Sequence, residues 1–486
     1  PHTKQLNPLN SIPMKALFSR IALLLLCSSI PLLARAQDQW TLSGVLQLAQ
    51  QRTLTVRLAD QNRRIAERDW QQFRRSNRPR VRLNGSLPNF SSAFREVTQP
   101  DGSIQFNPVR NNNSFFGLQV EQNIPLTGGI LQADFAFQRF DDFAERSQQY
   151  FVQPFSLTYF QPFFRSNPQK WDRQIAPRQR ALAEQQYRSQ RNDADQLASG
   201  HYFNVLIQEQ RLNIARDQQE VAQQLLRIAQ KRYELGQLTK SDLLQLDIQS
   251  LQAEQNIQTR ELAFRQAREN LELFLQKPTD GQRSLHRPEL PPVLAPEVEP
   301  LVRAALQRDP QLAELEIQLL QNRQRRRDLR SERGWQAGLL ASMGWSKSGE
   351  QLGEALNAPK LQQQVSLSFA LPLVDWGDYR QERRQLEDRG AQIEQRLTFR
   401  QQELQLATTQ ALAQYHQLRA ALATAQRTEQ LTSERFRIVK EQFLHDKISL
   451  IELTAATTEK EQAQVQYLTL LRDCWQRYLS LNGVLQ

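Results

Sequence analysis

The stretch that decides the fold occurs twice in the chain. Its first copy reads RYELGQLTKSDLL over residues 232–244, and its second reads QFLHDKISLIEL over residues 442–453. Thr239 of the first copy aligns with Ser449 of the second, 210 residues further on. The same separation recurs between two prolines that each close a predicted strand. A register that holds over this much sequence predicts a duplicated structural unit.

Each copy lies inside a very long helical stretch. The sequence predicts helices over 169–276 and 378–482, each broken once, at Gly236 and at Asp446. An arm of about 65 residues extends on the order of 100 Å at 1.5 Å per residue. No globular core covers such a length, so each arm needs helical neighbours along all of it.

An apolar seam with heptad spacing supports this interpretation, because small residues at such positions allow close helix contact. In the second unit the seam consists of Ala456, Ala463, Tyr467, Leu470, Cys474 and Leu481. The equivalent positions of the first unit are Leu246, Ala253, Ile257, Arg260, Phe264 and Leu271. Only Arg260 interrupts it.

Strand signals precede each long helix. Apolar and polar residues alternate over 335–345 and 365–371 in the second unit, and over 81–87 and 155–161 in the first. Strands of about ten residues with aromatic residues near their ends suit a transmembrane β-barrel. An ordinary soluble sheet shows the same alternation, so this pattern alone leaves both open.

A shorter helix precedes the strands in each unit, at 41–76 and at 298–331, and here the repeat register is 256. The two registers differ by 46 residues, which places an insertion in the first unit between Pro79 and Pro162. The insertion contains further strand candidates at 117–124 and 130–140. Whether these join the sheet is not decided by the sequence.

These signals predict the following organisation. Residues 1–36 are a signal segment, and 277–297 are a proline-rich linker between two repeats. Repeat 1 (37–276) holds a helix, β-strands with the insertion within 80–164, and a long helical hairpin at 169–276. Repeat 2 (298–486) holds a helix, β-strands within 335–372, and a long helical hairpin at 378–482.

The predicted signal segment consists of an apolar run over 21–33 that follows basic residues and ends in Ala34-Arg35-Ala36. This run is too short to span a membrane, and the A-x-A ending indicates cleavage before Gln37. A lipoprotein signal with Cys27 as its lipidation site is the competing interpretation. Cleavage after Ala36 leaves Cys474 as the one cysteine, so stability must come from packing.

Composition narrows the class of protein. A mean hydropathy of −0.63 is too polar for a helical membrane bundle. The net charge of +11 is compatible with nucleic-acid binding, but export from the cytoplasm argues against it. The sequence shows no metal-ligand spacing, phosphate-binding loop or nucleophile motif. We therefore expect no cofactor.

The strand count implies an oligomer. Two strand pairs give about four strands per chain, and an open sheet edge in lipid leaves backbone groups unsatisfied at several kcal/mol each. Four strands therefore cannot span a membrane alone. We expect several chains to donate their strands to one barrel and their helices to a second one.

The duplicated tip motif, RYxxGxxTxxDLL at 232–244 with its copy at 442–453, resembles the TolC family of outer-membrane channel-tunnels, as do the strand-ending Pro162 and Pro372. The resemblance covers 41–482. It implies a homotrimer in which a transmembrane β-barrel of twelve strands continues into a long periplasmic α-helical barrel of coiled-coil-like hairpins. It also implies a passive exit duct of a tripartite efflux pump or type I secretion system, without enzymatic activity. The implied location is the cell outer membrane, with contacts to outer-membrane lipid, to a periplasmic adaptor protein and, indirectly, to an inner-membrane pump.

The resemblance assigns a gate to Glu452, and more loosely to Asp242. In the family, acids at the position that matches Glu452 constrict the closed entrance. In a trimer these residues would form carboxylate rings that favour cations. Ala455 stands where the family often has a second acid, which weakens the expected constriction. Each acid also lies three residues after a hydroxyl residue, as in a capping box, so helix initiation alone is an alternative explanation.

The same resemblance assigns adaptor docking to the turn residues of the tips. These are Gly236, Leu238, Thr239, Ile448 and Ser449. Turn geometry is the simpler explanation, with Gly236 supplying a positive φ at the helix end. The chief alternative to the duct as a whole is an exported coiled-coil structural or adaptor protein without a pore. The exported substrate and the partner pump are not encoded in these signals.

Overall fold

The computed structural model describes residues 40–277, 285–444 and 448–485. The predicted signal segment 1–36 and the predicted helix break at Asp446 lie outside the described residues. The chain divides into two compact units. Unit 1 comprises the described parts of Pro1–Thr53, Asp195–Pro292 and Ala421–Gln476, and unit 2 comprises Leu54–Ala194, Val293–Ala420 and the C-terminal segment from Arg477.

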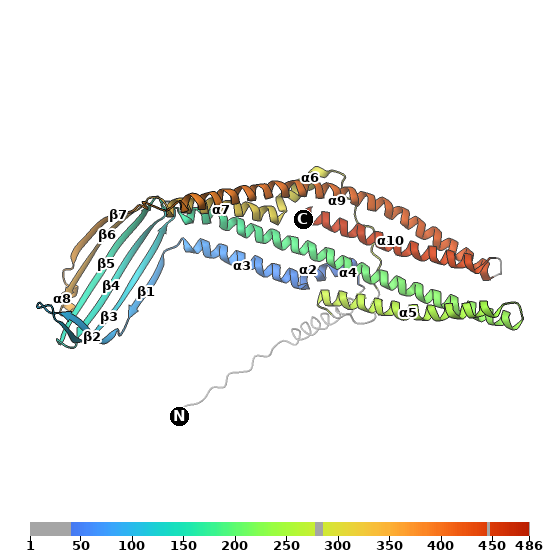
Figure 1. Ribbon diagram of the computed structural model, residues 1–486, viewed down its shortest axis with the longest axis horizontal. Coiled ribbons are helices and arrows are strands. Elements are labelled where there is room, and N and C mark those ends of the chain that lie inside the picture. Colours follow the sequence, from blue (N-terminus) through green and yellow to red (C-terminus); the bar gives the residue numbers. More distant parts are fainter. Residues whose placement is uncertain (1–39, 278–284, 445–447, 486) are drawn as a thin grey trace, which may run out of the picture. The chain divides into compact units, whose positions relative to one another are not determined.

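Unit 2 contains one antiparallel sheet whose strands lie side by side in Figure 1. Its order is β1-β3-β4-β5-β6-β7, and β2 pairs with the first part of β3. The chain thus forms an open sheet with β1 at one edge and β7 at the other. The strands are β1 (Arg80–Ser86), β2 (Phe90–Thr98), β3 (Ile104–Ile124), β4 (Gly129–Asp142), β5 (Ser147–Phe163), β6 (Gln336–Gly349) and β7 (Lys360–Ala370).

The prediction of four strands per chain in two pairs is wrong. Strand β1 does not pair with β5, because the insertion supplies β3 and β4, which lie between them. Strand β5 instead pairs with β4 and β6. Alternation marks a segment as a strand but does not select its partner, so the sequence could not place the inserted strands.

The shorter helices are each broken once, unlike the single helices that we predicted. Helices α2 (Leu42–Arg52) and α3 (Leu54–Ser76) are separated at Thr53, and α6 (Val298–Arg308) and α7 (Pro310–Glu332) at Asp309. Thr53 has an extended backbone, and Asp309 caps α7 by accepting a hydrogen bond from the Leu312 N–H at 2.8 Å. Pro310 at the first position of α7 has no N–H to continue α6.

The long helices are α4 (Pro168–Glu234), α5 (Lys240–Leu275), α9 (Asp378–Leu444) and α10 (Leu450–Leu485), and a short helix α8 (Leu352–Leu356) connects β6 to β7. Helices α4 and α9 each contain 67 residues and begin 210 residues apart. Helices α5 and α10 each contain 36 residues and also begin 210 residues apart. No described helix is long and apolar enough to cross a membrane.

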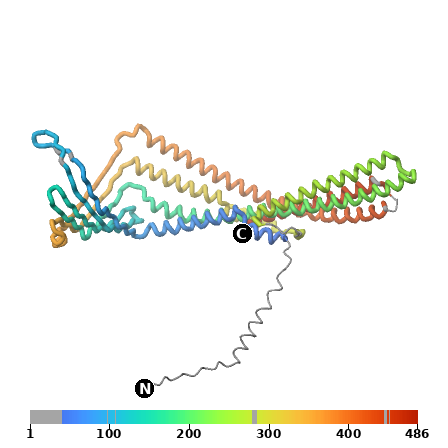
Figure 2. The backbone as a smooth tube through the Cα atoms, turned by 90° about the horizontal axis from the view of Figure 1, so that it is seen from below, coloured from blue at the N-terminus to red at the C-terminus, as the bar shows by residue number. Residues whose placement is uncertain are grey.

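In unit 1 the long helices lie in the order α5, α4, α10, α9, and both views show two adjacent hairpins (Figures 1 and 2). Polar contacts join α4 to α10 through Gln210 and Gln464, whose side chains lie 3.0 Å apart. Helix α4 contacts α5 through the ion pair of Arg216 with Glu261. Helix α10 is therefore covered on two sides, whereas α5 and α9 are outer helices.

The predicted seam of α10 is buried. Ala456, Ala463, Tyr467, Cys474 and Leu481 are at most 5% exposed. Leu470 is only half-buried, and the adjacent Leu471 is fully buried. The equivalent seam of α5 is half-buried, apart from the buried Leu271, which agrees with its outer position.

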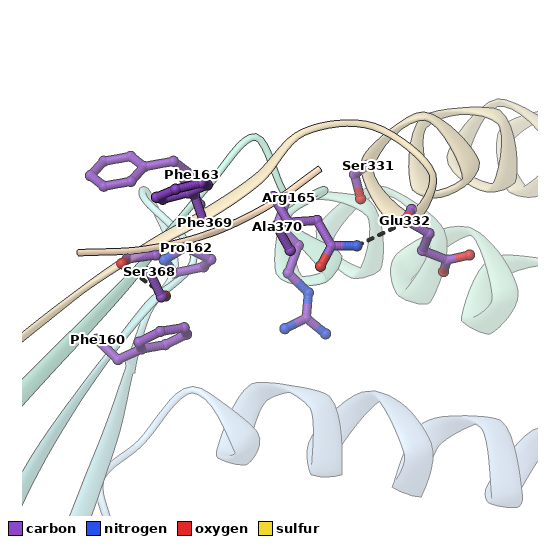
Figure 3. A pocket seen from close by; sticks show the side chains of 12 residues that line it. Phe160, Pro162, Phe163, Arg165, Ser331, Glu332, Ser368, Phe369 and Ala370 are labelled. Carbon is purple, nitrogen blue, oxygen red and sulfur yellow. Dashed lines mark hydrogen bonds between the residues drawn. The ribbon is translucent and has the colours of Figure 1, made fainter. Parts of the chain in front are cut away.

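At the end of the sheet nearest the helices in unit 2, β5 leads into α4, β6 follows α7, and β7 leads into α9. A cavity of about 430 Å³ lies there, lined by residues that include Phe160, Pro162, Glu332 and Phe369 (Figure 3). The Gln336 side-chain amide donates to the Glu332 carbonyl at 2.8 Å and ties the end of α7 to the start of β6. The predicted strand-ending Pro162 is the penultimate residue of β5 and pairs with Gly338. Strand β7 ends two residues before Pro372.

Candidate gate and docking surface at the helical tips

The first tip is a sharp turn between α4 and α5. Gly236 has a φ of +71°, and the backbone N–H of Gln237 donates to the Arg232 carbonyl at 2.8 Å. A left-handed residue with this hydrogen bond is a common helix ending that favours glycine. The structure thus confirms the turn role expected of Gly236.

Thr239 begins α5 as its N-cap. Its hydroxyl accepts a hydrogen bond from the Asp242 N–H at 3.2 Å and donates to the Asp242 carboxylate at 2.6 Å. The carboxylate therefore binds the capping hydroxyl itself instead of the cap's backbone N–H. Asp242 is nevertheless exposed to solvent at the N-terminus of a helix, where negative charge is favourable.

The second tip repeats this arrangement less tightly. The Glu452 N–H donates to the Ser449 hydroxyl at 3.3 Å, and both side chains are exposed. Ile448, which precedes the cap, is half-buried, as is Leu238 at the first tip. Both predicted acids thus lie in the first turn of their helices with their carboxylates free to face solvent.

Apolar side chains are exposed beside both caps. Leu235 is 72% exposed at the first tip and Ile451 is 79% exposed at the second. Both tips belong to unit 1 and lie at the same end of the two hairpins (Figure 2). Together with Leu238 and Ile448, they give this end an apolar surface beside two exposed carboxylates.

A polar layer that the sequence analysis missed crosses the hairpins below the tips. The Gln218 amide on α4 donates to both carboxylate oxygens of Glu461 on α10, at 2.8 and 2.9 Å. Asn256 on α5 donates to the Gln218 carbonyl oxygen at 3.4 Å. Burial raises the pKa of Glu461 above its ordinary value, and the Gln218 hydrogen bond opposes that rise. A charged residue two positions before the seam residue Ala463 was the available signal.

A second missed feature is a strap formed by the linker residues 285–293 over α9 and α10. Arg287 forms a two-point ion pair with Glu429 on α9, at 2.8 and 3.2 Å, and its guanidinium lies 3.9 Å from the ring centre of Tyr467 on α10. The Trp475 indole donates to the Glu289 carbonyl at 2.8 Å. The strap therefore ties α9 to α10, and the proline-rich composition gave no indication of it.

In the described parts of the chain, no group of three or more His, Cys, Asp or Glu side chains could hold a metal ion.

Residues 301–485 match the family model described as outer membrane efflux protein. No curated protein matches the chain. Among solved structures, the CmeC outer membrane channel of Campylobacter jejuni is 15% identical, with coverage of 100% of this chain and 93% of that chain and a TM-score of 0.62. The VceC outer membrane protein of Vibrio cholerae is 12% identical, with coverage of 91% and 94% and a TM-score of 0.61. The open MtrE outer membrane channel of Neisseria gonorrhoeae is 15% identical, with coverage of 91% and 88% and a TM-score of 0.58.

The match to the outer membrane efflux protein family thus covers the second repeat, from α6 to α10. The chain as a whole has the fold of these channels. The resemblance to the TolC family inferred from the duplicated tip motif is confirmed.

Proposed function

We propose that this protein is a passive outer-membrane exit duct of a tripartite efflux pump, closed at its helical tips. The observation that carries the proposal is the continuity of each long helical hairpin with one antiparallel sheet. Strand β5 leads into α4, and β7 leads into α9. A sheet that spans a membrane and helices that extend from it give one continuous path for solute.

The two repeats and three copies complete the duct in this proposal. Equal helix lengths at a constant separation support duplication. Helix α4 has as many residues as α9, and α5 has as many as α10. The outer position of α5 and α9 supports association. Helix α5 exposes Leu244, Ile248 and Leu251, which share one face at spacings of four and three residues. A neighbouring copy would cover this face.

Three copies place six tips around one axis, with Asp242 and Glu452 forming two rings of carboxylates. Such rings attract cations and repel anions. The polar layer of Gln218 and Glu461 joins the two hairpins of each chain, so opening must either break it or carry both hairpins together. The absence of a second acid at Ala455 leaves Glu452 as the main carboxylate of its ring.

The apolar surface at the tips is the proposed docking site for a periplasmic adaptor, which would connect the duct to an inner-membrane pump. Gly236, Leu238, Thr239, Ile448 and Ser449 form the turns that present Leu235 and Ile451. A cysteine at Leu238 tests the contact by cross-linking in cells. A cysteine at Gln252, exposed on α5 away from the tip, is the matched control. Capture of an adaptor from the first position alone supports docking, and capture from neither contradicts it.

The duct itself is tested by single-channel conductance of the detergent-extracted protein in a planar bilayer. We expect discrete, cation-preferring steps. Glu452→Ala is expected to raise the conductance of the closed state and lower the cation preference, and Asp242→Asn to act in the same direction with a smaller effect. Asp247→Asn, which removes an exposed charge on α5 outside the tip, is the control. Unchanged conductance and selectivity in Glu452→Ala would exclude a gating role.

The alternative of an exported coiled-coil adaptor or structural protein without a pore is disfavoured by the sheet. A hairpin adaptor has no need of a seven-stranded sheet connected to its helices. That alternative would be favoured if neither the wild type nor Glu452→Ala conducts in the bilayer, although each is an intact oligomer extracted from membranes.

A further inference from the structure

We propose that each chain contributes six strands to the wall of the membrane barrel, because the inserted strands β3 and β4 are wall strands. This inference rests on the proposed function above. Three copies would then close a barrel of eighteen strands, in place of the twelve that the sequence resemblance implies. The second copy of this chain is the partner of each sheet edge.

The faces of the inserted strands carry the argument. On β3, Phe116, Leu118 and Val120 point to one face, and their β4 partners are Phe137, Phe135 and Ala133. Between them on the opposite face stand Gly117, Gln119 and Glu121, opposite Ala136, Asp134 and Gln132. Over residues 116–121 and their partners 132–137, the inserted strands therefore have one apolar and one polar face. Beyond this stretch the apolar face ends at polar pairs, Ser114 with Arg139 and Asn112 with Asp141.

These faces continue those of the rest of the sheet. On the β1 side, Leu118 pairs with Leu83 and Val120 with Val81. On the β5 side, Ala133 pairs with Leu157, which pairs with Met343 of β6. Strand β7 completes the same face with Val365, Leu367 and Phe369. One mainly apolar face thus crosses the sheet from edge to edge, interrupted on β7 by Gln363, the partner of Met343.

The polar face is equally continuous. Gln119 of β3 pairs with Arg82 of β1 and with Asp134 of β4, which pairs with Ser156 of β5. On β7 the same face carries Gln362, Gln364, Ser366 and Ser368. A transmembrane barrel with a water-filled interior alternates apolar residues outside with polar residues inside along every strand. A hairpin lying in water beyond a barrel has no need of an apolar face in register with the wall.

The length of pairing points the same way. Strands β3 and β4 pair over fourteen residues, from Asn111 with Asp142 to Ile124 with Gly129. Strands β4 and β5 pair from Ile130 with Phe160 to Asp142 with Ser147, so they cover the same height. Only β2 and the first part of β3, which pair with each other, extend beyond it (Figure 2). About 9–11 tilted residues suffice to span a bilayer.

The edges also fit closure between copies. All neighbours in the path β1-β3-β4-β5-β6-β7 are antiparallel, so β1 and β7 run in opposite directions. Strand β7 of one copy can therefore pair antiparallel with β1 of the next, and every added copy keeps an even number of strands. All eleven residues of β7 are exposed in the single chain. An uncovered edge strand of this length presents unpaired backbone groups that can pair with a strand of another chain.

Eighteen strands would make the membrane channel wider. Barrel diameter grows roughly linearly with strand number, so the membrane segment would be about 1.5 times as wide as one of twelve strands. Barrels of this size leave an open aqueous channel. The membrane segment would thus admit solutes that a twelve-stranded barrel excludes, and the helical tips would be the narrowest point.

Spin labels on single cysteines in the reconstituted trimer test this proposal. The background is Cys474→Ala, and the vesicles contain phosphatidylethanolamine and phosphatidylglycerol. Labels at Leu118 and Phe135 sample the apolar face of β3 and β4, and labels at Gln119 and Asp134 sample the polar face. Leu367 and Ser366 on β7 form the reference pair. The readout is the ratio of collision rates with oxygen, which enters lipid, and with a water-soluble nickel chelate.

We expect a severalfold higher oxygen-to-nickel ratio at Leu118 and Phe135 than at Gln119 and Asp134, matching the difference on β7. High nickel access at all four positions of β3 and β4, with alternation kept on β7, would overturn the six-strand wall and leave the proposed duct intact. Loss of alternation on β7 as well would refute the membrane barrel of the proposed function. If Phe135→Cys does not assemble, Ala133→Cys reports on the same face.

Discussion

Helices α10 and α5 have the same length and the same place in their repeats, yet they are buried differently. In α10, Leu471 and Cys474 are fully buried, because α4 and α9 cover the helix on two sides. In α5, Phe264, the seam residue equivalent to Cys474, is only half-buried, and on another face Ile248 is 55% and Leu251 is 61% exposed. Two helices with equivalent apolar patterns thus have different surroundings within a single chain.

The difference shows which apolar surfaces are buried within one chain and which are left uncovered. The inner helix gains its stability inside the chain, whereas the outer helix keeps an apolar face for another molecule. The sheet shows the same division, with inner strands paired on both sides and the edge strands β1 and β7 paired on one. Outer helices and edge strands together define the surfaces that three copies would join.

The largest expected effect is on the inner helix. Leu471→Ala removes a fully buried side chain, and we expect a loss of about 2–5 kcal/mol in the free energy of unfolding. Urea unfolding followed by circular dichroism in detergent measures it. Gln466→Ala, on the exposed face of the same helix, should change that free energy by less than about 0.5 kcal/mol. Equal losses in the two variants would contradict the assignment of the seam.

A substitution on the outer helix α5 should weaken assembly of the trimer and leave folding of the chain unchanged. Leu251→Glu places a charge on the face that a neighbouring copy would bury, and we expect a rise in the trimer dissociation constant of about tenfold or more, since tenfold corresponds to only 1.4 kcal/mol. Light scattering on detergent-extracted protein measures the trimer fraction. Gln249→Glu adds the same charge at an exposed position on another face of α5. A trimer fraction that is equal in both variants would show that this face is not an interface.

A smaller effect distinguishes the two tips. Thr239→Ala removes a cap with two hydrogen bonds to Asp242, and we expect a local loss of about 1 kcal/mol in the first turn of α5. Ser449→Ala removes a single, longer hydrogen bond and should cost less in α10. Amide hydrogen exchange in residues 241–244 and 451–454 measures both. Equal protection losses would contradict the tighter cap at the first tip.

The smallest effect concerns pH. Burial raises the pKa of Glu461, a rise that Asp217 supports and that Gln218 and Lys460 oppose. The folded state therefore holds this proton more tightly than the unfolded state, so the contribution of Glu461 to stability falls as pH rises from its ordinary pKa towards the raised pKa. Glu461→Gln keeps an acceptor for the Gln218 amide and should remove that fall. Urea unfolding of both proteins across this pH interval tests it, and identical pH dependence would contradict a raised pKa.

Local features were predictable from the sequence because they depend on neighbouring residues. The heptad spacing predicted the buried positions Ala456 and Leu481, and the hydroxyl-to-acid spacing predicted the caps at Thr239 and Ser449. The constant separation of the repeats predicted the two pairs of long helices, and the structure adds that their lengths are equal.

Non-local features were not predictable. The alternation around Leu118 and Phe135 identified strands, but their pairing depends on the whole sheet. The contact of Arg287 with Glu429 joins residues 142 positions apart, and neither residue is distinctive in the sequence. The division of roles between α10 and α5 likewise depends on which helices lie beside them.

The central claim is that copies join β7 of one chain to β1 of the next. Cysteine cross-linking tests it most directly, in the Cys474→Ala background, with one cysteine at Leu83 and a second scanned over the apolar face of β7 at Leu361, Val365, Leu367 and Phe369. We predict that oxidation yields covalent dimers and trimers, and nothing larger, for the pair that lies in register. Monomers alone at every scanned position, from protein that is trimeric in detergent, would contradict the account.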